Sequence, residues 1–334
     1  ASVQKLVRAG AEVMIESGLG LGAGHSDEEY ATAGARVAHD RAALLAQAEL
    51  VLSLHKPPVA EIAQRKRGAI HVSMEMIPRT TRSQKMDALS SQANLAGYVM
   101  VLMAAARLPR ILPMMMTPAG TLKPASVFVI GAGVAGLQAI ATAKRLGAKV
   151  VAFDTRSVVA EQVQSVGAKF LEIDLGETGQ TKDGYAVQLT PEQLEKQKQG
   201  QAKQIAESDL VITTAQVFGR KPPVLVTRDM LAGMRPGSVI VDMAAETGGN
   251  VEGSVAGETV VVNGVTIIGD GNWANQVPRD ASQMYSSNLC NLIEEFWHKE
   301  EKRLVLNFED DILQGCVITH EGMIVNQTIK NLKR

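Results

Sequence analysis

Short apolar runs alternate with longer amphipathic segments along the whole chain, a pattern typical of βαβ units and parallel sheets. The clearest unit spans residues 126–156 and contains an apolar strand, a glycine-rich turn, a helix and a second apolar strand. A shorter α/β unit is predicted over residues 1–54, and its opening strand would lie upstream of Ala1. We therefore expect an α/β fold with two Rossmann-like domains that contain parallel sheets.

Other elements follow the same periodicities. Helices are predicted over 3–9, 27–34, 42–48, 86–107, 158–166 and 283–297, and strands over 12–16, 49–54, 170–173, 209–213, 238–243 and 265–269. The helix at 86–107 is apolar on every side, which favours burial around its whole circumference. The polar stretch 176–201 has little to bury and is expected to be an exposed loop that runs into a helix. The tail after Lys302 is predicted to be β-rich.

The order of these elements predicts a discontinuous first domain. We expect residues 1–89 and 277–334 to form it, with a nucleotide-binding Rossmann domain, residues 90–276, inserted between them. A length of 334 residues suits two domains.

Composition excludes several classes of function. Lys and Arg total 34 against 35 Asp and Glu, a balance that argues against a nucleic-acid partner. Only 4% of residues are aromatic, so an aliphatic core is expected, with Met114–Met116 among its fillers. Cys290 and Cys316 suit neither a disulfide framework nor a zinc site, and no metal is expected. No segment reaches the ~20 apolar residues of a membrane span, and the run Tyr98–Ala106 is predicted to be a buried helix.

A G-x-G-x-x-G motif lies between the predicted strand 127–130 and the predicted helix 137–146. Gly131 permits a tight turn, Gly133 lets a pyrophosphate approach the backbone, and Gly136 lets the helix pack closely on the strand. Backbone N–H groups from Val134 onward would face the phosphates. A structural βαβ turn without a ligand is the alternative reading.

An acidic residue follows the next strand at the position that suits an adenosine ribose. Asp154 is expected to accept hydrogen bonds from the ribose hydroxyls, and its charge favours NAD over NADP. Thr155 belongs to the same turn, and Arg156 is expected to cover the adenine. NAD(H) is therefore the predicted cofactor.

Two later clusters of small or polar residues also follow apolar strands. Ala215 and Gln216 come after 209–213, and residues 244–250 come after 238–243. The carboxyl ends of parallel strands line the ligand crevice of a doubly wound sheet, so both clusters are candidates for a nicotinamide pocket. Ordinary βα loops have similar compositions, and that alternative stays open.

At this point the chain resembles the NAD(H)-binding domain I, or alpha subunit, of proton-translocating NAD(P) transhydrogenase, and more distantly alanine dehydrogenase. The resemblance rests on residues 78–98, 113–121, 131–156, 183–186, 212–215, 219–225 and 244–250. It implies a Si/Re-specific enzyme that passes a hydride directly from NADH to NADP⁺ on a partner domain. A separate membrane domain would couple this step to proton translocation. The resemblance also implies a homodimer, held peripherally on the cytoplasmic side of a bacterial inner membrane.

The resemblance assigns catalytic roles to one loop. Arg79, Gln84 and Asp87 match the loop that holds the nicotinamide end of NAD(H), with the glutamine reaching toward the NADP-binding domain. Such a loop contributes positioning, because direct hydride transfer needs two rings held face to face. Without the wider match, these three residues would be interpreted as helix capping and surface solvation.

Further nucleotide contacts follow from the same resemblance. They are Ser90, Asn94, Gly184, Tyr185 and Gln197. Gly184 and Tyr185 match the tip of a mobile loop that closes over the nucleotide, with Gln197 behind it.

Two other functions remain as alternatives. An alanine dehydrogenase needs a substrate-binding lysine and a catalytic histidine, but this chain has His55 at the lysine position. Its connection between Lys56 and Ile70 is short, and the segment expected to carry the catalytic histidine is missing. A non-catalytic NAD-binding interaction module is the second alternative.

Overall fold

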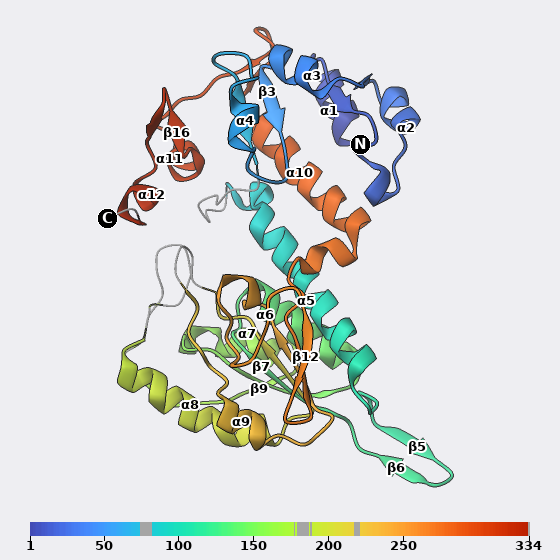
Figure 1. The fold of residues 1–334 in the computed structure, drawn as a ribbon, viewed down its shortest axis with the longest axis vertical. Helices are drawn as coiled ribbons and strands as arrows, with labels where there is room; N and C mark the ends of the chain where they lie inside the picture. The colour runs from blue at the N-terminus through green and yellow to red at the C-terminus, as the bar shows by residue number, and fades with distance from the viewer. Residues whose placement is uncertain (74–81, 177, 179–186, 188, 217–220, 333–334) are drawn as a thin grey trace. The chain divides into compact units, whose positions relative to one another are not determined.

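The computed structural model describes residues 1–73, 82–176, 178, 187, 189–216 and 221–332. The chain divides into two compact units, residues 1–92 with 277–334 and residues 93–276 (Figure 1). We describe each unit by itself.

The second unit contains a seven-stranded sheet with the order β12-β13-β11-β10-β7-β8-β9. The strands are β7 (Ser126–Ile130), β8 (Lys149–Phe153), β9 (Lys169–Phe170), β10 (Leu210–Thr213), β11 (Val239–Asp242), β12 (Thr259–Val262) and β13 (Val265–Ile268). Only the edge strand β12 is antiparallel to its neighbour. The six parallel strands have the order of a doubly wound Rossmann sheet, which confirms the predicted fold class.

Helices pack on this sheet because its strands are buried on both faces. They are α6 (Val134–Arg145), α7 (Ala160–Ser165), α8 (Pro191–Ala206) and α9 (Arg228–Ala232), with 3₁₀ turns η3 (Ser157–Val159), η4 (Ala245–Thr247) and η5 (Trp273–Gln276). Helix α6 contacts β7, β8, β10 and α7, whereas α8 contacts α9. Phe128, Phe153 and Ile205 belong to the apolar core between these elements.

Helix α8 corrects the prediction of an exposed polar loop over residues 176–201. It begins with a capping box, in which Thr190 accepts from the backbone N–H of Gln193 and the Gln193 side chain accepts in return from Thr190. Gln197, Gln201 and Ile205 lie four residues apart on one face and are buried. Composition alone did not reveal this face because two of its three members are polar.

Helix α5 (Ala88–Arg107) is buried on only part of its circumference. Met100, Val101 and Ala104 are buried, but Tyr98 is 41% exposed and Leu102 is 37% exposed, so the prediction of burial on all sides was wrong. Among the described residues, α5 is also the one helix with the length and apolar composition to cross a membrane, contrary to our expectation that no segment qualifies. A core helix can meet the same criterion.

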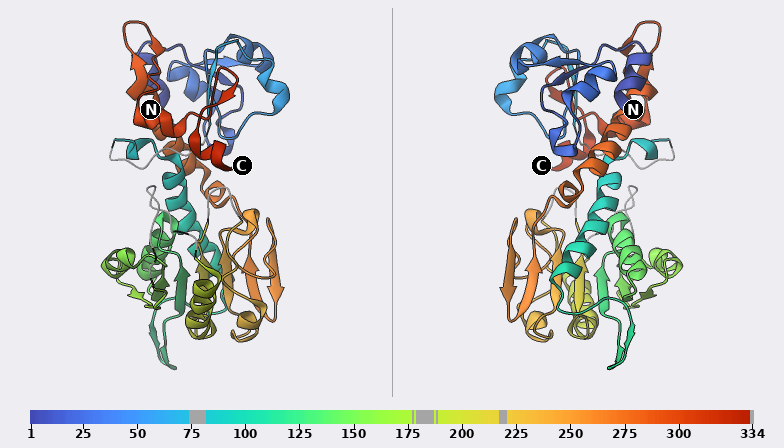
Figure 2. Two further views of the ribbon diagram at one scale, coloured as in Figure 1. Left: turned by 90° about the vertical axis from the view of Figure 1, so that its left-hand side faces the viewer. Right: turned by 90° about the vertical axis from the view of Figure 1, so that its right-hand side faces the viewer.

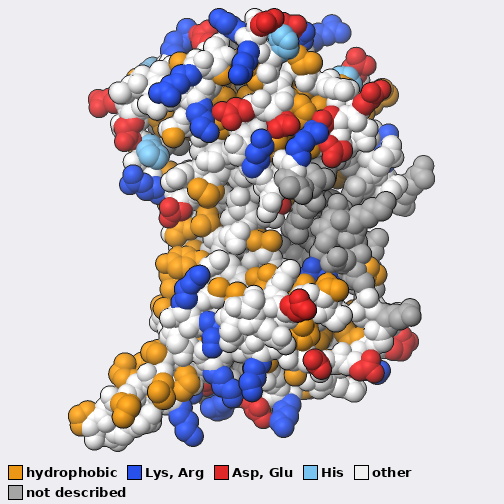
Figure 3. Space-filling view, turned by 180° about the vertical axis from the view of Figure 1, so that it is seen from behind, with side chains coloured by type: hydrophobic (Ala, Val, Ile, Leu, Met, Phe, Trp, Pro, Cys, Tyr) orange, Lys and Arg blue, Asp and Glu red, His pale blue; other side chains and the backbone are white. Residues whose placement is uncertain are grey.

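A hairpin of β5 (Met115–Thr117) and β6 (Gly120–Leu122) projects from the second unit (Figures 1 and 2). Met114, Met115 and Met116 are 63%, 44% and 80% exposed, so the expectation that they fill the core was wrong. Figure 3 shows the resulting apolar surface at the lower left. The methionines are exposed because the hairpin has no second layer to cover it.

The first unit is built from small elements around α10 (Pro278–Phe296), which contacts α1, η1 and η2. Its N-terminal part contains α1 (Ser2–Arg8), β1 (Met14–Glu16), η1 (Leu21–Ala23), α2 (Asp27–Thr32), β2 (Arg36–Ala38), α3 (Arg41–Gln47), β3 (Leu50–Leu52), α4 (Val59–Ile62), β4 (Ile70–Val72) and η2 (Gln84–Met86). Strands β1 and β2, and likewise β3 and β4, form parallel pairs.

The tail of the first unit differs from the β-rich prediction. It has two short hairpins, β14 (Trp297–His298) with β15 (Arg303–Leu304), and β16 (Thr319–His320) with β17 (Met323–Ile324). Helices α11 (Asp311–Cys316) and α12 (Gln327–Leu332) occupy the rest. Asp310 begins α11 as its N-cap by accepting from the Ile312 N–H, a local signal that the alternation of apolar residues obscured.

Candidate functional site

The glycine-rich turn between β7 and α6 has the tight geometry that its sequence predicts. Gly131 has φ +102°, and its N–H donates to the carbonyl oxygen of Phe153 at 2.8 Å. A Cβ on Gly136 would lie 1.9 Å from the Gly131 carbonyl oxygen, so only glycine fits there. A Cβ on Gly133 would meet no described atom within 4 Å, which leaves open space at the start of α6, where Val134 is the first helical residue. The turn therefore suits an anion that approaches the backbone.

Thr214 connects this turn to β10, at the point where the strand order reverses. Its N–H donates to the carbonyl oxygen of Ile130 at 2.9 Å, and its hydroxyl lies 3.1 Å from the carbonyl oxygen of Gly131. Ligands of doubly wound sheets bind at this switch point. Sequence reasoning placed Thr214 in a pocket-forming cluster but did not select it as a site residue.

Asp154 lies beside the turn and is paired with Arg156. Its carboxylate accepts from the N–H of Ala132 at 2.7 Å and from the N–H of Arg156 at 2.9 Å. The Arg156 guanidinium donates to both carboxylate oxygens, each at 2.9 Å, and this pairing raises the pKa of Arg156. Between these residues, the Thr155 carbonyl oxygen accepts from the hydroxyl of Thr178 at 2.7 Å.

The loops after β10 and β11 are joined by a buried amide. Asn250 Nδ2 donates to the carbonyl oxygens of Ala215 at 3.0 Å and Pro223 at 2.8 Å. Asp242, fully buried at the end of β11, accepts from the backbone N–H of Asn250 through both carboxylate oxygens. Gln216 donates across the same gap to the carbonyl oxygen of Met243 at 3.2 Å. The structure therefore brings the two predicted pocket clusters together, through two residues, Asp242 and Asn250, that sequence reasoning did not select.

The other predicted contacts of the second unit have different positions. Asn94 is exposed on α5, whereas Gln197 is buried on α8. Gln201, one turn after Gln197, is also buried, and both of its amide atoms lack a partner among the described residues. Gly184 and Tyr185 lie outside the described residues.

The predicted catalytic loop is described from Arg82 onward, so Arg79 lies outside the described residues. Gln84 is exposed in η2, and Asp87 is buried at the start of α5. The Asp87 carboxylate accepts from the N–H of Ser90 at 2.9 Å and from its hydroxyl at 2.6 Å, as an N-cap does. Asp87 therefore has the capping role that the sequence offered as an alternative, and its catalytic role stays a prediction.

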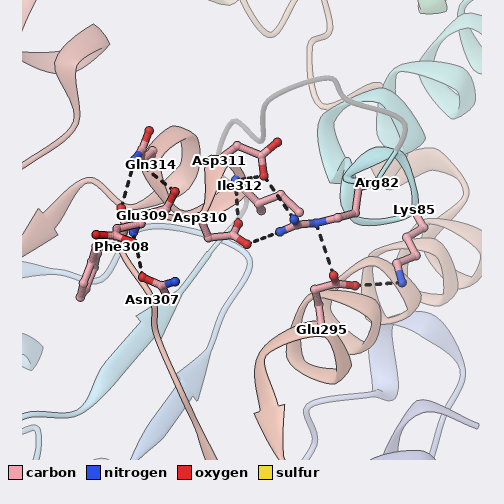
Figure 4. A network of polar contacts seen from close by, with 10 residues as sticks. All are labelled: Arg82, Lys85, Glu295, Asn307, Phe308, Glu309, Asp310, Asp311, Ile312 and Gln314. Atoms are coloured by element: carbon pink, nitrogen blue, oxygen red, sulfur yellow. Dashed lines mark hydrogen bonds and ion pairs between the residues drawn. The ribbon is translucent and has the colours of Figure 1, made fainter.

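Arg82 anchors this loop to the C-terminal part of the first unit (Figure 4). Its guanidinium pairs with Asp310, and it lies 3.4 Å from carboxylate oxygens of both Glu295 and Asp311. Lys85 Nζ lies 3.2 Å from a second oxygen of Glu295. The segment that contains Gln84 is thus held by side chains more than 200 positions away in sequence.

Amide side chains of α10 hold the backbone of the same loop. Asn288 and Asn291 both donate to the carbonyl oxygen of Lys85, at 3.0 and 2.8 Å. Two amide donors on one carbonyl oxygen fix the position of the residue that follows Gln84.

A half-buried histidine also lies in the first unit. His71 Nε2 lies 2.7 Å from the hydroxyl of Ser53, whose backbone carbonyl oxygen accepts from the Tyr285 hydroxyl at 2.6 Å. Burial lowers the pKa of His71, with a smaller contribution from the charge of Arg65. His55, at the position of the dehydrogenase lysine, is exposed.

Models of known families match both units. The N-terminal domain model of alanine dehydrogenase/PNT covers residues 1–74, and the C-terminal domain model covers residues 100–327. The chain belongs to the alanine dehydrogenase/PNT family. This membership confirms the resemblance on which the site predictions rest.

Within the alanine dehydrogenase/PNT family, transhydrogenase subunits are more similar to the chain than dehydrogenases are. It is 42% identical to an NAD(P) transhydrogenase subunit alpha of Rhodospirillum rubrum, over 98% of this chain and 93% of that protein. Identity with the alanine dehydrogenase of Halomonas elongata is 28%, over 98% and 90% of the two chains. The solved structure of a transhydrogenase from Sinorhizobium meliloti superimposes with a TM-score of 0.85 and 43% identity, covering 97% of this chain and 94% of that one.

Proposed function

We propose that this chain is the NAD(H)-binding component of a proton-translocating transhydrogenase, and that it positions NADH for direct hydride transfer to NADP⁺ on a partner domain. The observation that carries the proposal is the junction of Gly131, Thr214 and Asp154 at the switch point of the sheet. Identity of 42% with a transhydrogenase subunit over nearly the whole chain supports the same role.

The described residues suit a positioning role. The open backbone at Gly133 would receive the pyrophosphate, and Asp154 would receive the adenosine ribose. Bound NADH supplies a hydride, two electrons and one proton, so NADH becomes NAD⁺ as NADP⁺ becomes NADPH. Gln84 and Asp87, together with Arg79, would orient the nicotinamide amide without exchanging a proton.

The proposal includes the assembly. The partners are an NADP-binding domain and a membrane domain that couples hydride transfer to proton translocation, with this chain peripheral on the cytoplasmic side of the inner membrane. We also propose a homodimer, and the exposed apolar hairpin that carries Met115 and Met116 is the surface that favours it.

A reconstitution experiment tests the function. The chain is mixed with a separately purified transhydrogenase NADP-binding domain, and NADH-dependent reduction of an NADP⁺ analogue is followed by absorbance. Reduction is expected only when both proteins are present. Oxidation of L-alanine by the chain alone would instead support the dehydrogenase alternative, and NADH binding without hydride exchange would support the interaction module.

A further inference from the structure

The Asp154 carboxylate has no acceptor position left for a ligand. A carboxylate offers about four lone-pair positions. Oδ1 accepts from the backbone N–H and Nε of Arg156, while Oδ2 accepts from the N–H of Ala132 and from Nη2 of Arg156. The side chains of Asp154 and Arg156 are only 6% and 12% exposed, so the guanidinium also shields the carboxylate from solvent.

Two of these four donors belong to the backbone and hold the turn, because Ala132 lies inside the glycine motif. The other two belong to one mobile group, the guanidinium of Arg156. Ribose hydroxyls that donate to Asp154 must therefore take the positions of Nε and Nη2. A bidentate, charge-assisted pair is among the stronger polar contacts, so its loss opposes binding.

We propose that Arg156 is a specificity-determining residue that competes with the adenosine ribose for Asp154 and must swing away before the nucleotide binds. This inference rests on the proposed NAD(H) function. It differs from the expectation that Arg156 only covers the adenine, because a covering side chain would strengthen binding, whereas a competing one weakens it.

The same pair affects the choice between NAD and NADP. An unpaired carboxylate at this position would repel a 2′-phosphate of charge about −1.5 to −2. A guanidinium displaced from Asp154 stays tethered two residues away and offers that phosphate a bidentate partner. Arg156 therefore lowers affinity for NADH and at the same time reduces discrimination against NADPH.

Calorimetric titrations of the wild type, R156A and R156K test the proposal with four ligands: NADH, NADPH, ADP and 2′,3′-dideoxy-ADP. We expect R156A to bind NADH and ADP about tenfold more tightly, equivalent to about 1.4 kcal/mol. Affinity for dideoxy-ADP should stay unchanged because that ligand lacks the competing hydroxyls. NADPH should bind R156A more weakly than it binds the wild type. R156K, which keeps the charge without the planar fork, should fall between the two.

Thermal unfolding without ligand verifies that both variants fold. Equal or weaker NADH binding by R156A overturns the proposal while leaving the proposed function intact. A gain that also appears with dideoxy-ADP overturns it too, since the ribose hydroxyls would then not be the competitors. If the wild type binds no NADH, the proposed function fails, and the competition for Asp154 fails with it.

Discussion

The hydroxyl of Thr214 lies 3.1 Å from the carbonyl oxygen of Gly131, although the two residues are 83 positions apart. This contact joins the ends of β7 and β10 where the strand order of the sheet reverses. A Cβ on Gly131 would approach the same hydroxyl to 2.4 Å, so the threonine also restricts that position to glycine. The shape of the nucleotide turn thus depends on a residue from a later strand.

Thr214→Val should weaken NADH binding about tenfold, because the loss of one hydrogen bond of about 1–1.5 kcal/mol loosens the turn. Fluorescence titration with NADH measures the effect. Thr214→Ser should restore most of the affinity, and Thr259→Val on the edge strand β12 is the matched control. Wild-type affinity in Thr214→Val would show that the contact does not shape the site.

Two glycine substitutions in the motif should have different effects. Gly136→Ala places a methyl group 1.9 Å from a backbone oxygen, so we expect it to destabilise the second unit by about 1–3 kcal/mol or more. Gly133→Ala meets no described atom and should fold normally, yet lose NADH affinity because the methyl group fills the approach to the backbone. Thermal unfolding and NADH titration separate the two, and equal melting temperatures would contradict the first expectation.

The His71 imidazole should make stability depend on pH. Burial lowers its pKa below the ordinary 6.5, so the unfolded chain binds a proton more readily than the folded one. Its contribution is therefore complete above about pH 6.5 and is lost as the pH falls through the folded pKa. Denaturant melts between pH 5 and 7.5 should show a smaller slope for His71→Gln than for the wild type. The exposed His55→Gln is the control, and an unchanged slope in His71→Gln would refute the assignment.

Arg82→Ala should slow hydride transfer without altering the KM for NADH. The substitution releases the loop from Asp310 and Glu295, and small misplacements of positioning residues cost up to about 10²-fold in rate. Steady-state kinetics with the NADP-binding partner provides kcat and KM separately. Arg303→Ala, which breaks an exposed ion pair with Glu301, should leave both unchanged. A change confined to KM would assign Arg82 a role in binding instead.

The predictions made from the sequence succeeded where structure is local. The strand, turn, helix and strand over residues 126–153 follow from apolar periodicity and the spacing of three glycines, and the structure has them. Helix α8 was partly missed because its buried face carries Gln197 and Gln201. The methionines at 114–116 were misplaced because an apolar residue shows its composition, but not whether a second layer covers it.

By itself, the sequence determined the fold class, the family and the glycine turn, because each depends on residues close together in the chain. The tertiary structure decided what those residues contact. Thr214 supports Gly131, Asn250 joins the two later loops, and Asp310 holds Arg82, through contacts that span 27 to 228 positions. Hydrogen bonds between distant segments leave no periodicity in the sequence. Asp154 shows the difference most clearly: its position follows from the motif, but its pairing with Arg156 is decided by the folded turn.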